Sequence, residues 1–500
     1  MALAPAAFGA ATEPRFAVRA FEIEGEVPIG RERALAILAP YTGESVELAQ
    51  LQNATSALEA ELIARGFPFY RVVLPPQSLD GTVTIRVLPF KLAKVEVTGN
   101  THFPTENILA SLPALRTGES PNISAVGRNR SAANEHPSKE LDITFRPSDV
   151  PDSIDVEVKV RDERPLSFFV GLNNIGDRRT GVWRTTAGVQ HSNLWGLDHS
   201  VTATYTTSPE KTSDVKQYGL FYRAPFYSVS GALTLFYAYS DVNSGLVANA
   251  FQVSGRGRFS GIHWKQHLTP HGAYSHAVEL GLDDRFFDND VRFAAAQLGV
   301  DVRSRPVSVT YQARLDQAEA SYTGGLQYVR NLGGGSDNND AAYMGNRAGA
   351  ARDWNAVRYT LDAQWRIPYG ALGLRVRGQH ANEPLIPGEQ FGLGGASSIR
   401  GLREREVAGD VGISATLEAL FPMPWEGVNA IVFVDAGEAR VKNVQPGQLE
   451  RQGAMSAGLG LRWAVGRRFY LALDAAQVID GTTASLPGDR RIHIAVVYRF

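Results

Sequence analysis

From Leu166 to the C-terminus, the chain repeats short segments in which apolar and polar residues alternate. Residues 357–366, VRYTLDAQWR, are apolar at every odd position and polar at every even one. A period of two is that of a β-strand with one apolar face, and a helix cannot produce it. About sixteen such segments begin near residues 166, 182, 199, 216, 229, 250, 274, 306, 320, 356, 371, 411, 428, 454, 469 and 492.

An even number of ~10-residue alternating strands is typical of a transmembrane β-barrel with a lipid-facing surface and a wet lumen. The alternative is a soluble β-solenoid or a chain of β-sandwiches. Aromatic residues toward strand ends, such as Trp365 and Trp463, favour the barrel because they suit a membrane interface. The polar face carries Arg, Asp and Gln, which a sandwich core would not tolerate unpaired. The last segment alternates up to Phe500, as the closing strand of a barrel does.

The composition narrows the class of protein. The chain of 500 residues is longer than a domain with a single hydrophobic core usually is, so more than one domain is expected. The 50 Lys and Arg balance 52 Asp and Glu, which argues against a nucleic-acid-binding protein. Cysteine is absent, so disulfides and Cys-ligated metals are excluded. No apolar run approaches the ~20 residues of a transmembrane helix.

The first 165 residues or so mix helix and strand signals. Segment 16–90 predicts the order β-α-α-β-β, with Gly66 as the C-cap of the second helix and a turn at Asp80-Gly81. Segment 91–164 repeats the opening strand, a helix at 104–112 and two closing strands. Its stretch 118–139 is rich in Ser, Asn and Pro, and no second helix can be assigned there.

Three motifs resemble those of the two-partner secretion transporters (TpsB, the haemolysin secretion/activation family) within the BamA-like superfamily. Residues 74–81, LPPQSLDG, resemble their first POTRA domain. Residues 391–402, FGLGGASSIRGL, resemble their Gly-Gly and Val-Arg-Gly-aromatic loop, and 433–437, FVDAG, their Phe-x-Asp-x-Gly strand. The residues that carry the first motif are Pro75, Pro76, Gln77, Asp80 and Gly81.

The resemblance implies two α+β POTRA domains followed by an all-β barrel of about sixteen antiparallel strands. We expect POTRA domains at 16–90 and 91–164, and a barrel at 165–500 with an inward-folding loop at about 384–408. Residues 1–15, which are small and apolar at their start, are expected to be a leader or its remnant. The family often carries a plug helix, and we expect none in the fifteen residues before Phe16.

In the family, the loop arginine pairs with the aspartate of the Phe-x-Asp-x-Gly strand. Carried over, Arg400 is expected to meet Asp435, because the strand period points Asp435 into the lumen and a carboxylate facing lipid would be costly. Gly401 is expected to let the loop tip turn sharply. Ile399 and Leu402 replace the family's Val and aromatic residue, so the tip packing is expected to differ.

The remaining expected site residues frame this contact. Phe433 and Gly437 share the strand with Asp435, and the Gly394-Gly395 pair is expected to turn the chain at the start of the tip. The C-terminal Phe500, with Tyr498, resembles the recognition signal for barrel assembly.

The resemblance implies an outer-membrane pore that secretes a large partner exoprotein by two-partner (type Vb) secretion. The client would be an adhesin, a haemolysin or a contact-dependent toxin, captured unfolded by the POTRA domains in the periplasm of a Gram-negative bacterium. The expected partners are this exoprotein, outer-membrane lipid and the barrel-assembly machinery, and no nucleic acid. The alternatives are a barrel-assembly insertase and a passive porin, but the 74–81 motif favours the transporter, and a porin needs no residues 16–165.

Enzymatic motifs are weak or missing. The Gly-Leu-Gly-Gly run at 392–395 lacks the Lys-Ser/Thr of a phosphate loop. Neither a His-Glu-x-x-His pattern nor a Gly-x-Ser-x-Gly elbow occurs. We therefore expect no catalytic residue, no metal and no cofactor.

Overall fold

The computed structural model describes residues 15–78, 80–241, 256–288 and 300–500, together with four two-residue strands. These are β14 (Leu246–Val247), β15 (Phe251–Gln252), β18 (Arg292–Phe293) and β19 (Ala296–Gln297). The chain divides into one unit of residues 1–134 and 139–162 and a second of residues 135–138 and 163–500. The expected leader, apart from Arg15, and Leu79 of the first motif lie outside the described residues. No helix in the described ranges is long and apolar enough to cross a membrane.

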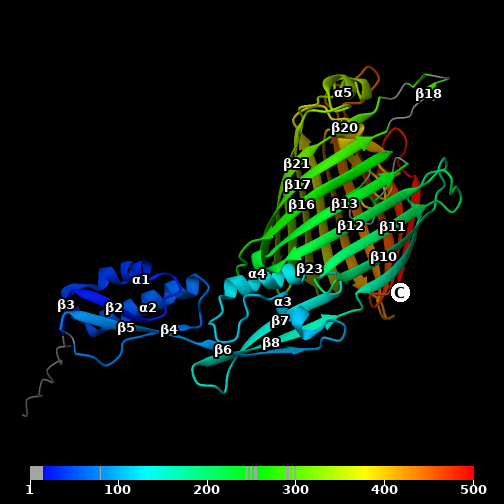
Figure 1. Ribbon diagram of the computed structural model, residues 1–500. Coiled ribbons are helices and arrows are strands. Elements are labelled where there is room, and N and C mark those ends of the chain that lie inside the picture. The colour runs from blue at the N-terminus through cyan, green and yellow to red at the C-terminus, as the bar shows by residue number, and fades with distance from the viewer. Residues whose placement is uncertain are drawn as a thin grey trace, which may run out of the picture. The chain divides into compact units, whose positions relative to one another are not determined.

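The first half of the α/β unit is a three-stranded sheet packed against two helices (Figure 1). Its strands are ordered β2-β5-β4, with β2 parallel to β5 and β4 antiparallel to it. The apolar stripe of α2 faces the core, because Leu51, Ala54, Leu58 and Leu62 are all fully buried. The elements are β1 (Arg15–Val18), β2 (Ala20–Gly25), α1 (Arg31–Leu38), η1 (Ala39–Tyr41), β3 (Gly43–Glu47), α2 (Leu48–Ala64), β4 (Tyr70–Val73) and β5 (Thr82–Pro89).

The predicted β-α-α-β-β order of this half is confirmed, and a small antiparallel pair of β1 with β3 is added to it. Gly66 follows α2 with a φ of 88°, the left-handed conformation that ends a helix without strain. The two helices bury their apolar faces on the sheet, which is why a stripe of period 3.6 was readable in the sequence.

The second half repeats the plan with a sheet ordered β6-β8-β7. Its second helix, α4, lies where the sequence pattern assigned none. The Asn122 side chain caps it by accepting from the Ala125 N–H at 2.9 Å. The helix buries small residues, Ala132 and Ala133, beside Val126, and so few large apolar residues leave a weak periodic signal. The elements are β6 (Lys91–Thr98), α3 (Thr105–Ala110), α4 (Ile123–Ala133), β7 (Lys139–Pro147) and β8 (Ser153–Asp162).

The second unit is a closed, antiparallel barrel of sixteen strands, as predicted (Figure 1). Its last strand, β31, pairs with its first, β9, so that the barrel has no free edge. The strands are β9 (Leu166–Asn173), β10 (Arg184–Leu194), β11 (His199–Thr207), β12 (Gln217–Phe226), β13 (Gly231–Ser240), β16 (Gly257–His267), β17 (Tyr274–Phe287), β21 (Pro306–Asp316), β22 (Ala320–Asn331), β23 (Asn355–Ile367), β24 (Gly370–Ala381), β27 (Val411–Pro422), β28 (Val428–Arg440), β29 (Arg451–Val465), β30 (Phe469–Asp480) and β31 (Arg490–Arg499), while β20 (Val302–Ser304) also pairs with β17.

The alternation of each strand separates two surfaces. On β28, Val432 is 48% exposed on the outside, whereas Phe433 and Asp435 are 1% and 0% exposed on the inside. The aromatic residue Trp463, near the end of β29, is 39% exposed, so it lies on the outside as well. Apolar side chains therefore face the surroundings and polar ones the lumen, the reverse of a soluble core.

We refer to the end of the barrel at which β9 ends, at Asn173, as the outer end. Here the β22–β23 connection carries α5 (Asp340–Asn346) (Figure 1). Tyr343 and Trp354 of this connection are fully buried and pack with Leu385 and Ile386 of the β24–β27 connection. The outer end is thus filled by a small hydrophobic core of its own. The remaining 3-10 turns of this unit are η2 (Tyr227–Val229) and η3 (Pro387–Glu389).

Candidate functional site

The connection between β24 and β27, residues 382–410, folds back into the barrel and is called the inward loop. Its stem carries η3 and a short hairpin of β25 (Phe391–Leu393) with β26 (Val407–Gly409). Gly394 and Gly395 follow β25 with φ values of 111° and 89°. Only glycine takes this backbone conformation without strain, so the pair turns the chain toward the tip, as expected.

The tip of the loop packs against the inner wall through apolar side chains. Ile399 and Leu402 are fully buried in a cluster with Leu393 of the loop and with Ala454 and Val478 of the wall. The small side chain of Ala454 on β29 leaves room for these branched side chains. The two positions at which the sequence departs from the family pattern are therefore packing positions.

Arg400 lies at the tip and meets Asp435 of β28. Its Nε donates to Asp435 Oδ2 at 2.8 Å and its Nη2 to Oδ1 at 2.7 Å, a bidentate pair. The backbone N–H of Arg400 also donates to Oδ2, at 3.1 Å. The two side chains are 3% and 0% exposed. A bidentate, charge-assisted contact of this kind fixes the orientation of both groups.

Two further carboxylates surround the guanidinium group. Arg400 Nη1 donates to Glu418 Oε1 of β27 at 2.6 Å and lies 3.7 Å from Asp474 Oδ1 of β30. The ring of Phe433 lies beneath, its centroid 3.3 Å from the guanidinium carbon. The aromatic face attracts the cation and excludes water from one side of it. Three strands and an aromatic ring thus hold one side chain of the loop.

Glycines let the tip approach the wall. A Cβ at Gly401 would lie 2.8 Å from Val478 Cγ2 and 2.9 Å from Ser456 Cβ, and a Cβ at Gly437 would lie 2.9 Å from a Leu393 methyl group. The φ of Gly401 is not in the left-handed range. The chain does turn here as expected, because the Leu402 N–H donates to the Ile399 carbonyl at 3.0 Å. The turn does not use a left-handed glycine, and Gly401 is needed for close approach to the wall.

Four polar contacts of the tip were not predicted. Thr416 donates to Asp435 Oδ1 at 2.9 Å, and Ser456 Oγ accepts from the Gly401 N–H at 3.2 Å. His493 Nε2 donates to the carbonyl oxygen of Arg400 at 2.7 Å. Glu418 is the fourth. The strand period places all of them in the lumen, but only the strand registers set their depth. For example, Thr416 of β27 and Ser456 of β29 both lie opposite Asp435 of β28.

A cavity of about 580 Å³ lies beside the tip in the lumen. Its lining mixes polar and apolar side chains, and the charged and polar ones include Arg375, Glu418, Asn429, Arg462 and Asp474. Arg462 is itself paired with Asp474 through two contacts of 2.8 and 3.0 Å. The barrel therefore encloses space beside the loop that is lined in part by charged groups, as is typical of the lumen of a transmembrane barrel.

The 74–81 motif connects the strands of the first half of the α/β unit. The Gln77 side chain donates to the Thr84 carbonyl and accepts from the Thr84 N–H, both at 2.7 Å. Gly81 has a φ of 107°, and its carbonyl accepts from the Arg19 N–H at 2.7 Å. Pro75 is half-buried, whereas Pro76 and Asp80 are exposed. The motif residues thus shape the approach to β5.

The C-terminal aromatic residues lie on the outside of the barrel. Tyr498 and Phe500 are 43% and 68% exposed, and their rings meet edge to face at 4.9 Å. The Phe500 N–H donates to the Phe168 carbonyl of β9 at 2.8 Å, so the last residue belongs to the closing pair of strands.

Two family profiles match the chain. The profile of the haemolysin secretion/activation protein ShlB/FhaC/HecB matches residues 152–463, and that of the ShlB-type POTRA domain matches residues 16–89. The chain belongs to the ShlB/FhaC/HecB family. Its relatives include the outer membrane transporter CdiB of Dickeya dadantii, 23% identical over 419 residues, which span 80% of this chain and 71% of the relative.

Another relative is the heme/hemopexin transporter protein HuxB of Haemophilus influenzae, 21% identical over 470 residues, or 89% of this chain and 80% of the relative. The fold matches that of CdiB from Escherichia coli with a TM-score of 0.76 at 18% identity, over 100% of this chain and 93% of that one. The ShlB/FhaC/HecB family is a family of secretion pores rather than a family of enzymes.

The protein is accordingly an outer-membrane pore of two-partner secretion, with its POTRA region in the periplasm. Strand β9 follows the periplasmic POTRA region in the chain, so it enters the membrane from the periplasmic side. The outer end of the barrel, at which β9 ends, is therefore the extracellular end. The inward loop therefore starts outside and reaches back into the channel. The insertase and porin alternatives are not favoured by these matches.

Proposed function

We propose that Arg400 and Asp435 lock the inward loop inside the pore, and that this lock is required for secretion of the partner exoprotein. The observation that carries the proposal is the bidentate contact of 2.7 and 2.8 Å between two side chains that are both nearly fully buried. Removing one partner of a dry pair costs about 3–5 kcal/mol, whereas a wet pair contributes only ~0–1 kcal/mol.

The test compares Arg400→Ala, Asp435→Ala and the double variant for secretion and for barrel folding. We expect each single variant to insert a folded barrel and to impair secretion, and the double variant to be little worse, because partners in one contact are not additive. Arg403→Ala is the matched control, since Arg403 lies on the same tip but is exposed. Normal secretion by Arg400→Ala, or single defects that simply add, would contradict the lock.

We further propose that the POTRA region captures the unfolded client by adding a strand to a sheet edge. The edge strand β7 supports this. The N–H of Leu141 donates to Asn134 Oδ1 at 2.7 Å, and its carbonyl accepts from Asn134 Nδ2 at 2.9 Å. A side-chain amide thus already makes, at this edge, the pair of bonds that a client backbone would make.

Residues 16–165 expressed alone are expected to bind the N-terminal secretion domain of the partner exoprotein. In an antiparallel strand every second residue points its backbone to the same edge, so Ile143 shares the outward edge with Leu141. Ile143→Pro removes that N–H and should weaken capture, whereas Ile143→Val should not. If the fragment does not bind while secretion still needs it, edge capture is wrong and the region is a spacer.

The client is expected to be one large exoprotein: an adhesin, a cytolysin or a contact-dependent toxin. Co-purification with the full-length protein tests this, because an insertase would instead retain many barrel precursors.

The exposed pair of Tyr498 and Phe500 is proposed to be the signal read by the barrel-assembly machinery. Phe500→Ala should reduce insertion in cells, and Arg499→Ala at the neighbouring position should not.

We propose that the chain itself catalyses no reaction and that folding of the exoprotein outside the cell biases transport. Liposomes containing only the purified pore and its client test this. Transport without added nucleotide is expected, and an absolute requirement for ATP with purified components would contradict it.

A further inference from the structure

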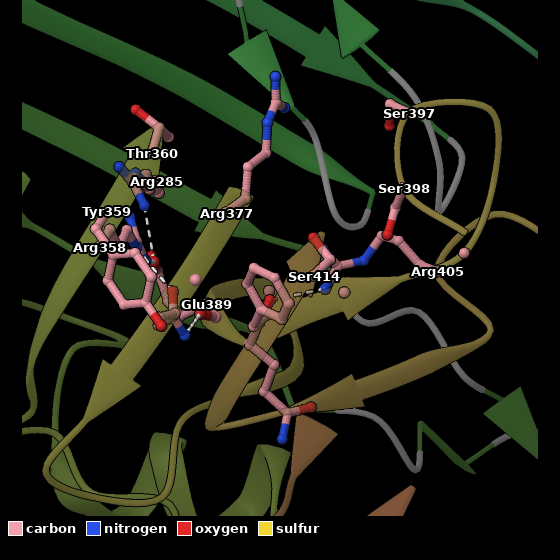
Figure 2. Close-up of a pocket in the computed structure, with 17 residues that line it drawn as sticks. Arg285, Arg358, Tyr359, Thr360, Arg377, Glu389, Ser397, Ser398, Arg405 and Ser414 are labelled. Atoms are coloured by element: carbon pink, nitrogen blue, oxygen red, sulfur yellow. Dashed lines mark hydrogen bonds and ion pairs between the residues drawn. The ribbon is translucent and has the colours of Figure 1, made fainter. Parts of the chain in front are cut away.

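Glu389, in the stem of the inward loop, makes ionic contacts with the barrel wall that no motif predicts (Figure 2). Its side chain is 0% exposed. Its Oε2 accepts from Arg285 Nη1 of β17 at 2.7 Å and from Arg358 Nη2 of β23 at 3.0 Å. Its backbone carbonyl accepts from Gln379 Nε2 of β24 at 3.0 Å. Three strands therefore hold the stem as well.

The stem and the tip are held by different parts of the wall. The tip contacts β27, β28 and β30 through Arg400, whereas the stem contacts β17, β23 and β24 through Glu389. The two groups of strands share no member. The strands of the wall consequently hold the tip and the stem of the loop at two separate places.

The loop and the wall carry opposite charges at the two places. At the tip, the loop supplies the guanidinium group and the wall supplies the carboxylates. At the stem, the loop supplies the carboxylate and the wall supplies two guanidinium groups. Arg285 also donates to Asp283 Oδ2 at 2.6 Å, so the stem cluster alternates in sign from Asp283 through Arg285 and Glu389 to Arg358. Neutralising Glu389 leaves two arginines against one carboxylate in a buried site.

A cavity of about 340 Å³ adjoins the stem contact. Figure 2 shows Glu389 with Arg285 and Arg358 on one side of it, and Ser398 and Arg405 of the loop on the other. Arg405 Nη2 donates to the carbonyl oxygen of Gln390 at 3.0 Å, which braces the η3 turn from within the loop. The stem and tip contacts have no side chain in common, so each can hold the loop without the other.

We propose that Glu389 is a positioning residue that ties the stem to the wall independently of Arg400, so that the inward loop leaves the channel only when both ties are broken. The tie concerns the same loop as the lock proposed above but rests on separate residues, and it does not depend on client capture.

The open fraction of the full-length pore in planar lipid bilayers measures the loop directly, without a client. Glu389→Gln keeps the size of the side chain and removes its charge. We expect it to raise the open fraction about tenfold, equivalent to about 1.4 kcal/mol. Because independent free energies add, the effects of Glu389→Gln and Arg400→Ala should multiply in the double variant. Glu383→Gln, at an exposed position of the same loop, is the matched control and should match the wild type.

Two further variants separate positioning from folding. Arg358→Met removes one of the two wall arginines of the tie and should raise the open fraction in the same direction as Glu389→Gln. Glu389→Asp should recover part of the closed state. Heat-modifiable gel migration reports whether each barrel is folded. An unchanged open fraction in folded Glu389→Gln, or a double variant no different from Arg400→Ala, would overturn the second tie. An effect of Glu389→Gln but none of Arg400→Ala would leave the stem tie standing and remove the tip lock.

Discussion

Two leucines in the middle of their elements show how differently the two units use the same residue. Leu58 of α2, in the α/β unit, is 0% exposed and packs against the sheet. Leu459 of β29, in the barrel, is 63% exposed and points away from the lumen. The charges are distributed in the opposite way: the Glu61 side chain of α2 is 26% exposed, whereas that of Asp435 of β28 is 0% exposed.

The difference follows from the solvent that each unit meets. The α/β unit lies in water and gathers its apolar side chains inside, so its ion pairs lie at the surface and contribute little. The barrel lies in lipid and turns its apolar side chains outward, so its interior is free to hold charged contacts that fix the loop. The two units are therefore inverted arrangements of apolar and charged side chains.

The largest expected effect is at the buried leucine of the α/β unit. Leu58→Asp places an unpaired carboxylate in a hydrophobic core, which costs several kcal/mol. This cost is a large part of the free energy of unfolding of so small a domain. We expect residues 16–89 to lose their fold, seen as loss of the circular-dichroism melting transition. Ser56→Asp, at an exposed position of the same helix, should melt like the wild type. A cooperative transition in Leu58→Asp near that of the wild type would contradict the assigned core.

The corresponding charge in the barrel tests the lipid-facing surface. Leu459 lies near the middle of β29, and Leu459→Arg should cost about 2–4 kcal/mol if it faces the midplane of the membrane. Denaturant unfolding of the barrel reconstituted in lipid measures this cost. Leu459→Met conserves the apolar contact and is the control. If arginine is tolerated in lipid as well as methionine is, then Leu459 does not face the bilayer.

A smaller effect is expected at the close contact of the tip. Gly401→Ala adds a methyl group that meets Val478 and Ser456 at less than 3 Å, and such overpacking typically costs about 1–3 kcal/mol. We expect a displaced tip and a raised open fraction in planar bilayers, with an intact barrel. Ala396→Ser, at an exposed position of the tip, should have no effect. A closed channel in Gly401→Ala would mean that the wall yields and that the contact is not limiting.

The smallest expected effect concerns the surface carboxylate of α2. Hydrogen bonds from Arg65 and Arg33 hold the pKa of Glu61 below its usual range. A pKa lower in the folded than in the unfolded state stabilises the fold above the unfolded value, and this contribution is lost as the pH falls through the folded pKa. Glu61→Gln should therefore show slightly less loss of melting temperature on acidification than the wild type. An equal loss in both proteins would mean that the contacts of Glu61 are too exposed to matter.

Much of the fold was predictable because its signals are local. The period of two located the sixteen strands, and the stripe from Leu51 to Leu62 located α2. Both patterns follow from which face of a single element is buried, which any window of ten residues reports. Helix α4 was missed for the same reason, since its buried face is built mainly from alanine and asparagine.

The candidate site was predictable only in part. The strand period alone placed Asp435 in the lumen, and the family motifs paired it with Arg400. The contacts of Glu418, Asp474 and Ser456 with the tip were not predicted. The alternation along each strand correctly places these side chains on the lumen face, but it does not give the register of one strand against the next. Glu389 was missed because a single carboxylate in a loop carries no pattern at all.

The sequence by itself determined which elements form, which face of each strand is apolar, and that the strands must close. Those properties depend on neighbours one to four positions away along the chain. Only the tertiary structure decided that Glu389 meets Arg285, more than a hundred positions earlier, and that Arg400 meets three carboxylates of separate strands. These contacts depend on barrel closure, strand register and the depth to which the loop folds inward, because only these bring residues so distant in the chain to within hydrogen-bonding distance.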